Sequence, residues 1–178
     1  MRFTSCATAI LLVGACLAAG CGYRPASTPL PAGYRSVSVP AVENRSAHAG
    51  LSAELTASLR RQLARRGAVV VPEGEGAPRL LCAVIGAAGE AGTLGAERNR
   101  LVPVDTLWRI ELEGELVRAD GLSLAGPIRV SASGRSIYGR SAAEAEALGR
   151  RERSNLLDAA ARRLLDRLGD SPPRPKRD

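Results

Sequence analysis

Aromatic residues and histidine are scarce in this sequence. Only 3 % of its 178 residues are aromatic, and His48 is the single histidine. So few rings leave no platform on which nucleic-acid bases could stack, so we expect no nucleic-acid partner. One histidine cannot make a zinc site without several carboxylates beside it, so we expect no metal and no cofactor.

A long apolar run is also lacking. The uncharged stretch from Ala7 to Leu17 is shorter than the about 20 apolar residues that cross a bilayer. It follows Arg2 and ends in small residues, which is typical of a signal peptide. Ala18-Ala19-Gly20-Cys21 predicts a lipoprotein that is cut before Cys21 and acylated on its sulfur. Val13-Gly14-Ala15-Cys16 is a second possible site, but it would leave a rather short apolar region.

Cysteine is equally limited in the exported part. Of the four cysteines, Cys6 and Cys16 leave with residues 1–20 and Cys21 becomes a thioether. Cys82 is then the only thiol, so no intramolecular disulfide can form. Unpaired cysteine is among the most buried residue types, and we expect Cys82 to pack as a small hydrophobic residue.

The positive charge comes almost entirely from arginine, because Lys176 is the single lysine. Without residues 1–20 the side chains carry 24 basic against 18 acidic groups, a net charge of about +6. In an exported protein this excess points to anionic envelope material, such as phosphorylated lipid headgroups or lipopolysaccharide. Arginine suits bidentate phosphate binding, although a GC-rich genome also explains the preference.

Groups for catalysis are not assembled by any motif. His48 lies in the polar loop 44–50, where we expect it to be solvated. Gly134-Arg135-Ser136-Ile137-Tyr138 lacks the second glycine of a nucleophile elbow. Glu111, Glu113 and Glu115 alternate as the polar face of a strand does, which favours a solvated face over a carboxylate pair. We therefore expect no enzyme.

Four segments are predicted: a signal peptide over 1–20, an acylated tether over 21–33, a folded domain over 34–169, and a disordered basic tail over 170–178. Within the domain, Arg35–Val39 alternates as a strand. Leucines 51, 55, 59 and 63 predict an amphipathic helix that ends at Gly67. The β-branched run 68–71 and the apolar stretch 80–88 predict two more strands, the latter central.

A long hairpin gives the clearest pattern. Trp108, Ile110, Leu112 and Leu116 share one face, and the partner strand after the Asp120-Gly121 turn repeats the alternation up to Tyr138. The capping box Ser141–Glu144 opens a second helix that runs to Leu168. The predicted fold class is α/β (α+β): a two-layer sandwich with two helices on one face of a mostly antiparallel or mixed sheet of four to five strands.

Several motifs carry a family resemblance. They are Cys21-Gly22-Tyr23, Leu30-Pro31-x-Gly33-Tyr34, Pro40 to Ser46, and Gly50-Leu51-x-x-Glu54-Leu55-Thr56. Together with the order of elements, they resemble the LptE family of lipopolysaccharide-assembly lipoproteins over nearly the whole mature chain. The sequence departs from the family pattern at Val42, where an aromatic residue is usual.

The resemblance implies a protein without enzymatic activity that sits as a plug in the outer-membrane barrel LptD and helps place lipopolysaccharide in the outer leaflet. It also implies lipopolysaccharide binding through basic residues, and Gly22 after the cysteine implies sorting to the periplasmic face of the outer membrane. The alternative is an envelope lipoprotein that activates a peptidoglycan synthase or forms part of a secretion complex.

Four arginines are candidate lipopolysaccharide contacts. Arg98 and Arg100 fall in the glycine-rich stretch 89–103, expected to be a loop that is free to reach a ligand. Arg129 and Arg135 project from a strand face, where glutamates 111, 113 and 115 are possible partners across the hairpin.

Overall fold

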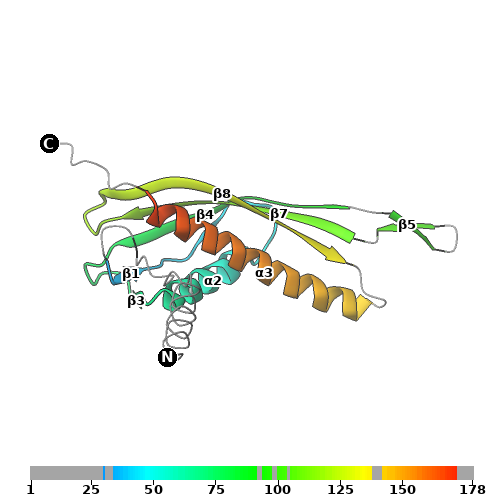
Figure 1. Cartoon of the computed structure of the whole chain (residues 1–178), viewed down its shortest axis with the longest axis horizontal. Helices are drawn as coiled ribbons and strands as arrows, with labels where there is room; N and C mark the ends of the chain where they lie inside the picture. The colour runs from blue at the N-terminus through cyan, green and yellow to red at the C-terminus, as the bar shows by residue number, and fades with distance from the viewer. Residues whose placement is uncertain are drawn as a thin grey trace, which may run out of the picture.

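Two helices cover one face of a mixed sheet (Figure 1). The computed structural model describes residues 30, 34–91, 94–97, 100–103, 105–137 and 142–171, with the backbone alone described over 91–106 and 136–147. The elements are β1 (Ser36–Ser38), β2 (Glu43–Asn44), α2 (Leu51–Arg65), β3 (Val69–Val71), β4 (Arg79–Ala91), β5 (Leu94–Glu97), β6 (Arg100–Pro103), β7 (Asp105–Val117), β8 (Ser123–Ile137) and α3 (Ala142–Gly169).

The main sheet has the order β3-β1-β4-β7-β8, with β2 added to β4. β1 runs parallel to β3, because α2 makes the crossover between these two strands. β1 also runs parallel to β4. β4, β7 and β8 are antiparallel neighbours. β4 therefore lies at the centre of the sheet, and β3 and β8 form its edges.

The core lies between the helices and the inner face of the sheet. The leucines of α2 at 51, 55, 59 and 63 are buried, because a spacing of four residues puts them on one side of the helix. Ile110, Leu112 and Leu116 of β7 face them from the sheet. Leu30, upstream of the first strand, is 7 % exposed and belongs to the same core.

The hairpin of β7 and β8 packs against α3. Gly121, with a φ of 88°, occupies the left-handed conformation that its turn requires. The inner face of the hairpin packs against α3 at Leu157, Ala161 and Leu164, all of them buried.

The helix α3 also reaches the edge strand through two arginines. Arg163 donates a hydrogen bond to the carbonyl oxygen of Ser131 at 2.7 Å, and Arg167 donates one to that of Arg129 at 3.3 Å. These contacts place the second half of α3 along β8.

The predicted fold class is confirmed: an α+β sandwich with both helices on one face, the central strand β4 and the long hairpin. The main sheet has six strands rather than four to five, because the short strand β2 pairs with β4. The prediction of a loop over 89–103 is wrong. β4 continues to Ala91, and β5 pairs with β6 in a separate two-stranded sheet.

Several predicted features lie outside the described residues: the signal peptide, the tether except Leu30, Tyr138, Ser141 of the capping box, and the tail beyond Ser171. Among the helices that are described, none is long and apolar enough to cross a membrane.

Candidate functional site

The face of the sheet opposite the helices is open. Along β7 the residues that alternate with the core positions are Leu107, Arg109, Glu111, Glu113 and Glu115, and β8 presents Arg129, Ser131 and Ser133 on the same side. Leu81 of β4 also lies on this face and is 40 % exposed. Within the described chain no helix packs on it, so this face can meet a partner.

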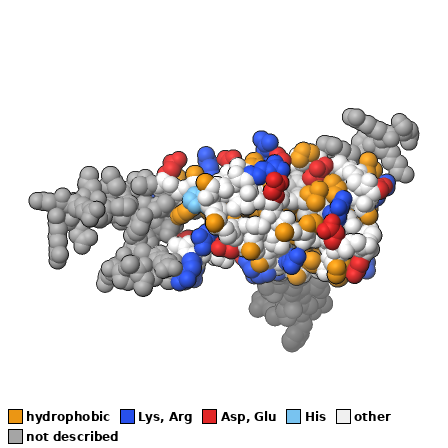
Figure 2. All heavy atoms as spheres, turned by 180° about the vertical axis from the view of Figure 1, so that it is seen from behind, with side chains coloured by type: hydrophobic (Ala, Val, Ile, Leu, Met, Phe, Trp, Pro, Cys, Tyr) orange, Lys and Arg blue, Asp and Glu red, His pale blue; other side chains and the backbone are white. Residues whose placement is uncertain are grey.

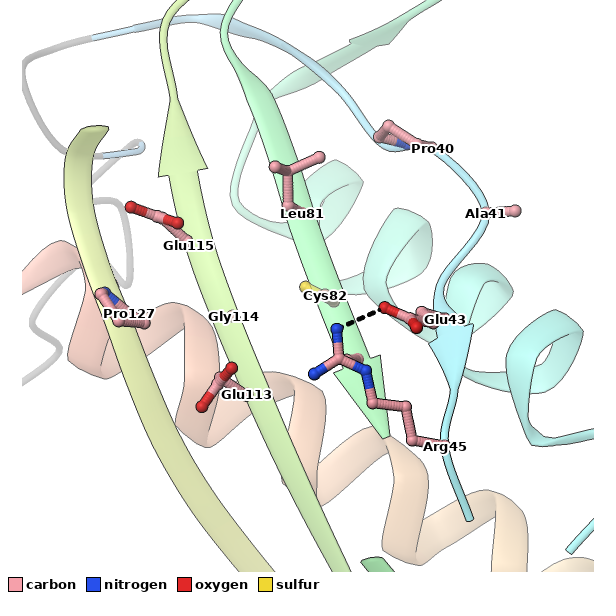
Figure 3. A pocket seen from close by; sticks show the side chains of 11 residues that line it. Pro40, Ala41, Glu43, Arg45, Leu81, Cys82, Glu113, Gly114, Glu115 and Pro127 are labelled. Carbon is pink, nitrogen blue, oxygen red and sulfur yellow. Dashed lines mark hydrogen bonds and ion pairs between the residues drawn. The ribbon is translucent and has the colours of Figure 1, made fainter. Parts of the chain in front are cut away.

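A shallow hollow of about 360 Å³ lies on the open face, toward the end of the sheet that holds the β7–β8 turn (Figure 3). Its wall is formed by three parts of the chain that are distant in sequence: the residues around β2, the strand β4, and the β7–β8 hairpin. The lining residues are Pro40, Ala41, Glu43, Arg45, Leu81, Cys82, Ala83, Glu113, Gly114, Glu115 and Pro127. The centre is thus apolar and the rim charged.

The charges at the rim form two ion pairs, one within the chain at β2 and one between β7 and β8. Arg45 donates a hydrogen bond to Glu43 at 2.6 Å, and Arg129 donates one to Glu113 at 2.6 Å. The hydrogen bond from Arg45, with the charge of its guanidinium, lowers the pKa of Glu43 in spite of some desolvation. The pKa of Arg45 is raised chiefly by Glu43, and the charge of Glu113 adds to this effect.

This arrangement suits binding rather than acid–base chemistry. A carboxylate held in its charged form by an arginine is a poor proton donor or acceptor near neutral pH. Among the residues that the structure describes, no group of three or more His, Cys, Asp or Glu side chains could hold a metal ion.

His48 is not simply solvated, as its loop position suggested. Its ring meets Trp108 of β7 edge-on, with centroids 5.2 Å apart, and its exposure is intermediate. Asn44 fixes the loop by donating its side-chain amide to the carbonyl oxygen of His48 at 2.7 Å. In Figure 2 the pale blue side chain of His48 lies toward one end of the molecule. The contact with Trp108 gives the histidine a packing role.

Cys82 packs against the core, as the sequence predicted. Burial raises the pKa of its thiol to about 12. The thiolate is the nucleophilic form, so Cys82 is unreactive at neutral pH.

The predicted site residues are not brought together. Cys21 and Arg98 lie outside the described residues, and Arg100 is the first residue of β6, for which only the backbone is described. Arg129 pairs with Glu113, as the alternation across the hairpin suggested. Arg135 lies opposite Leu107 on the exposed face and is not a free cation.

Sequence reasoning missed the hollow. Glu43, Arg45 and Pro127 showed no motif, because their meeting depends on the order of strands in the sheet. A local signal was present only in the alternation of Glu43 and Arg45 across Asn44, which matches a short strand.

Comparison with known families gives one decisive result. The model of the LptE family, described as lipopolysaccharide-assembly, matches residues 34–170. The chain belongs to the LptE family. The resemblance inferred from the motifs is therefore confirmed over the whole folded domain of this LptE-family chain. Comparison with curated proteins gives no match.

Solved structures share the fold of this LptE-family chain. A minor lipoprotein from Acinetobacter baumannii has a TM-score of 0.53 at 15 % identity, covering 79 % of this chain and 98 % of that protein. A putative lipoprotein from Caulobacter crescentus has a TM-score of 0.50 at 18 % identity, covering 75 % and 87 %. A hypothetical protein from Chlamydia trachomatis has a TM-score of 0.52 at 9 % identity, covering 78 % and 97 %. At these identities the likeness concerns the fold.

Proposed function

We propose that this chain is an outer-membrane lipoprotein that partners an LptD-type barrel and assists lipopolysaccharide assembly in the outer leaflet. It is held at the periplasmic face by acylated Cys21 and catalyses no reaction. The observation that carries this proposal is the match of the LptE family over residues 34–170. That match favours this function over activation of a peptidoglycan synthase or a place in a secretion complex.

We assign the open face of the sheet to the barrel. An apolar centre with a charged, solvated rim is the usual anatomy of a protein–protein interface. In the hollow, Leu81, Pro40 and Pro127 supply the apolar part, and the pairs Glu43–Arg45 and Glu113–Arg129 supply the rim.

Crosslinked copurification from native membranes tests the partnership. We expect an LptD-type barrel to copurify with the wild-type chain, and Leu81→Glu to reduce its yield roughly tenfold, as for a residue central to an interface. Leu122→Glu is the matched control, since Leu122 is 46 % exposed beside the β7–β8 turn and is not among the residues that line the hollow. Recovery of a synthase or a secretion ring instead of a barrel would refute the proposal. Equal barrel yields for both variants would refute the assigned face.

Acylation of Cys21 anchors the protein in this proposal. Cys21→Ala should abolish labelling by palmitate and release the protein from membranes, because several acyl chains on one residue give stable anchoring. Unchanged labelling would move the site to Cys16. Recovery only in inner-membrane fractions would contradict the proposed localisation.

Arg98 and Arg100 remain the first candidates for contact with lipopolysaccharide phosphates, with Arg129 and Arg135 as the second pair. Reversing Arg98 and Arg100 to Glu should weaken binding of lipopolysaccharide and flatten its dependence on salt, because screened ionic contacts are removed. The melting temperature should change little. A double variant that binds as tightly as wild type at low salt would eliminate this pair.

A further inference from the structure

The hollow on the open face carries more acidic than basic groups. Three of its lining residues are glutamates, Glu43, Glu113 and Glu115, and one is an arginine, Arg45. Arg129 adds a second positive charge beside the hollow through its ion pair with Glu113. The hollow therefore holds one carboxylate more than it has cations.

Glu115 is the carboxylate that is left over. Its side chain is half-buried, and among the residues that the structure describes it makes no hydrogen bond and no ion pair. Figure 3 shows Glu115 at the hollow, with no dashed line leading to it. Its charge is thus partly withdrawn from water without a donor that compensates the loss, which costs free energy.

The local structure explains why no donor reaches Glu115. On the β4 side its partner is Leu81, which is apolar. On the β8 side the register shifts at this point, so that Glu115 has no Cα partner there. The segment that passes it is Gly126-Pro127, which offers no polar side chain, and proline has no N–H. A Cβ atom built on Gly126 would lie 3.0 Å from the Cα atom of Glu115, so the two strands come close here.

The arginines around the hollow are held by other acids. The ion pairs are Arg45–Glu43 at 2.6 Å, Arg129–Glu113 at 2.6 Å and Arg79–Glu73 at 3.3 Å. Arg79 lies two residues before Leu81 on β4 and so on the same face of that strand. The described part of the domain thus supplies no cation for Glu115, and a partner can.

The surroundings of Glu115 suit a long basic side chain. Leu81, 40 % exposed, and Pro127 are apolar walls beside it. Lysine and arginine bury their aliphatic stems along apolar surface and keep the charged end at a polar group. A shallow hollow of about 360 Å³ is at the low end of the range for ligand pockets, which enclose most of their ligand. A side chain that projects from a protein surface fits this shape better.

We propose that the hollow receives a lysine or arginine side chain of the barrel, whose stem lies across Leu81 and Pro127 and whose charge pairs with Glu115. The proposal rests on the proposed function for the identity of the partner. It goes further in naming the chemical group that is recognised and the residue that selects it, because a neutral or acidic side chain would leave the carboxylate unpaired.

Copurification of the LptD-type barrel with Glu115→Gln tests this, since glutamine keeps the shape of the side chain and removes its charge. We expect the barrel yield to fall roughly tenfold, as for one partner of an interfacial charge pair. Washing with about 0.5 M instead of about 0.05 M salt should lower the wild-type yield and leave that of the variant nearly unchanged, because salt screens the ionic contact.

Glu75→Gln is the matched control. Glu75 is an exposed glutamate in the turn between β3 and β4, has no ion pair among the described residues, and does not line the hollow. Its yield should stay within about twofold of wild type, because an exposed, unpaired charge contributes little. Glu111→Gln, on the same strand face but outside the hollow, should lose less than Glu115→Gln. Thermal melts of the mature chain check that all three variants fold.

The outcomes separate this proposal from the proposed function. A wild-type chain that recovers the barrel while Glu115→Gln recovers it equally well would overturn the proposal and leave the partnership standing. So would equal losses for Glu111→Gln and Glu115→Gln, or a loss for Glu115→Gln with the same salt dependence as wild type. A wild-type chain that recovers no barrel would refute both.

Discussion

Gly114 is a residue at which β7 comes very close to α3. A Cβ atom built on it would lie 2.6 Å from Cδ2 and 3.0 Å from Cδ1 of Leu164, a side chain that is fully buried. The absence of a side chain at this position thus lets the helix settle onto the sheet. The glycine is needed here for space rather than for its backbone conformation.

Gly114→Ala should lower the free energy of unfolding by about 1–3 kcal/mol, because it overpacks a closed core. Chemical denaturation of the mature chain measures it. Combining the change with Leu164→Val should recover part of the loss. Gly149→Ala, in α3 with nothing within 4 Å of its Cβ, should instead stabilise by about 0.5–1 kcal/mol. If Gly114→Ala and Gly149→Ala lowered the free energy of unfolding by the same amount, the result would contradict the close approach of β7 and α3.

At the scale of elements, α2 and α3 are joined by polar contacts as well as by leucines. The hydroxyl of Ser58, which is fully buried, donates to Asp158, and Arg61 donates to the same carboxylate at 2.9 Å. Burial alone raises the pKa of Asp158, but the hydrogen bonds from Ser58 and Arg61, with the charges of Arg61 and Arg65, outweigh it and lower the pKa.

Asp158→Ala should lower the free energy of unfolding by about 1–3 kcal/mol at pH 7, because it leaves the Ser58 hydroxyl buried without an acceptor. The folded pKa of Asp158 lies below the unfolded value, so its stabilisation is complete above about pH 4 and is lost as the pH falls through the folded pKa. Urea denaturation at pH 7 and at low pH checks this. If the difference in the free energy of unfolding between Asp158→Ala and wild type were the same at both pH values, the ionised carboxylate would not have this role.

How far the sequence predicts an element depends on whether its pattern is local. The β7–β8 hairpin was predictable because alternation and a tight turn fix its register, and Arg129 does lie opposite Glu113. The β5–β6 hairpin was missed because glycines 89, 92 and 95 have the composition of a loop. The hollow on the open face could not be predicted, since its residues come from strands whose order is set by long-range packing.

At the scale of the whole molecule, the core extends beyond the domain boundary expected at residue 34. Leu30 contributes its side chain to the cluster that includes the leucines of α2 and the inner face of the sheet. Leu30 therefore has a structural role, although it lies in the stretch that the sequence predicts to be a tether.

Leu30→Ala should lower the free energy of unfolding by about 2 kcal/mol or more, since it removes buried methyl groups from a packed core. Leu122→Ala is the control, with a side chain 46 % exposed and an expected change within about 0.5 kcal/mol. Denaturation of both variants in the mature chain compares them. Equal denaturation midpoints for Leu30→Ala and Leu122→Ala would show that Leu30 does not contribute to the core.

The contacts of α3 with the edge strand bear on how many copies can share a membrane. Copies confined to a surface meet far more often than in solution, and an unpaired strand edge is a template for joining another chain. Arg163 and Arg167 already occupy the carbonyl oxygens of Ser131 and Arg129 on β8. These side chains hinder the addition of another strand to this stretch of the edge. Neighbouring copies can therefore lie side by side without pairing their β8 strands there.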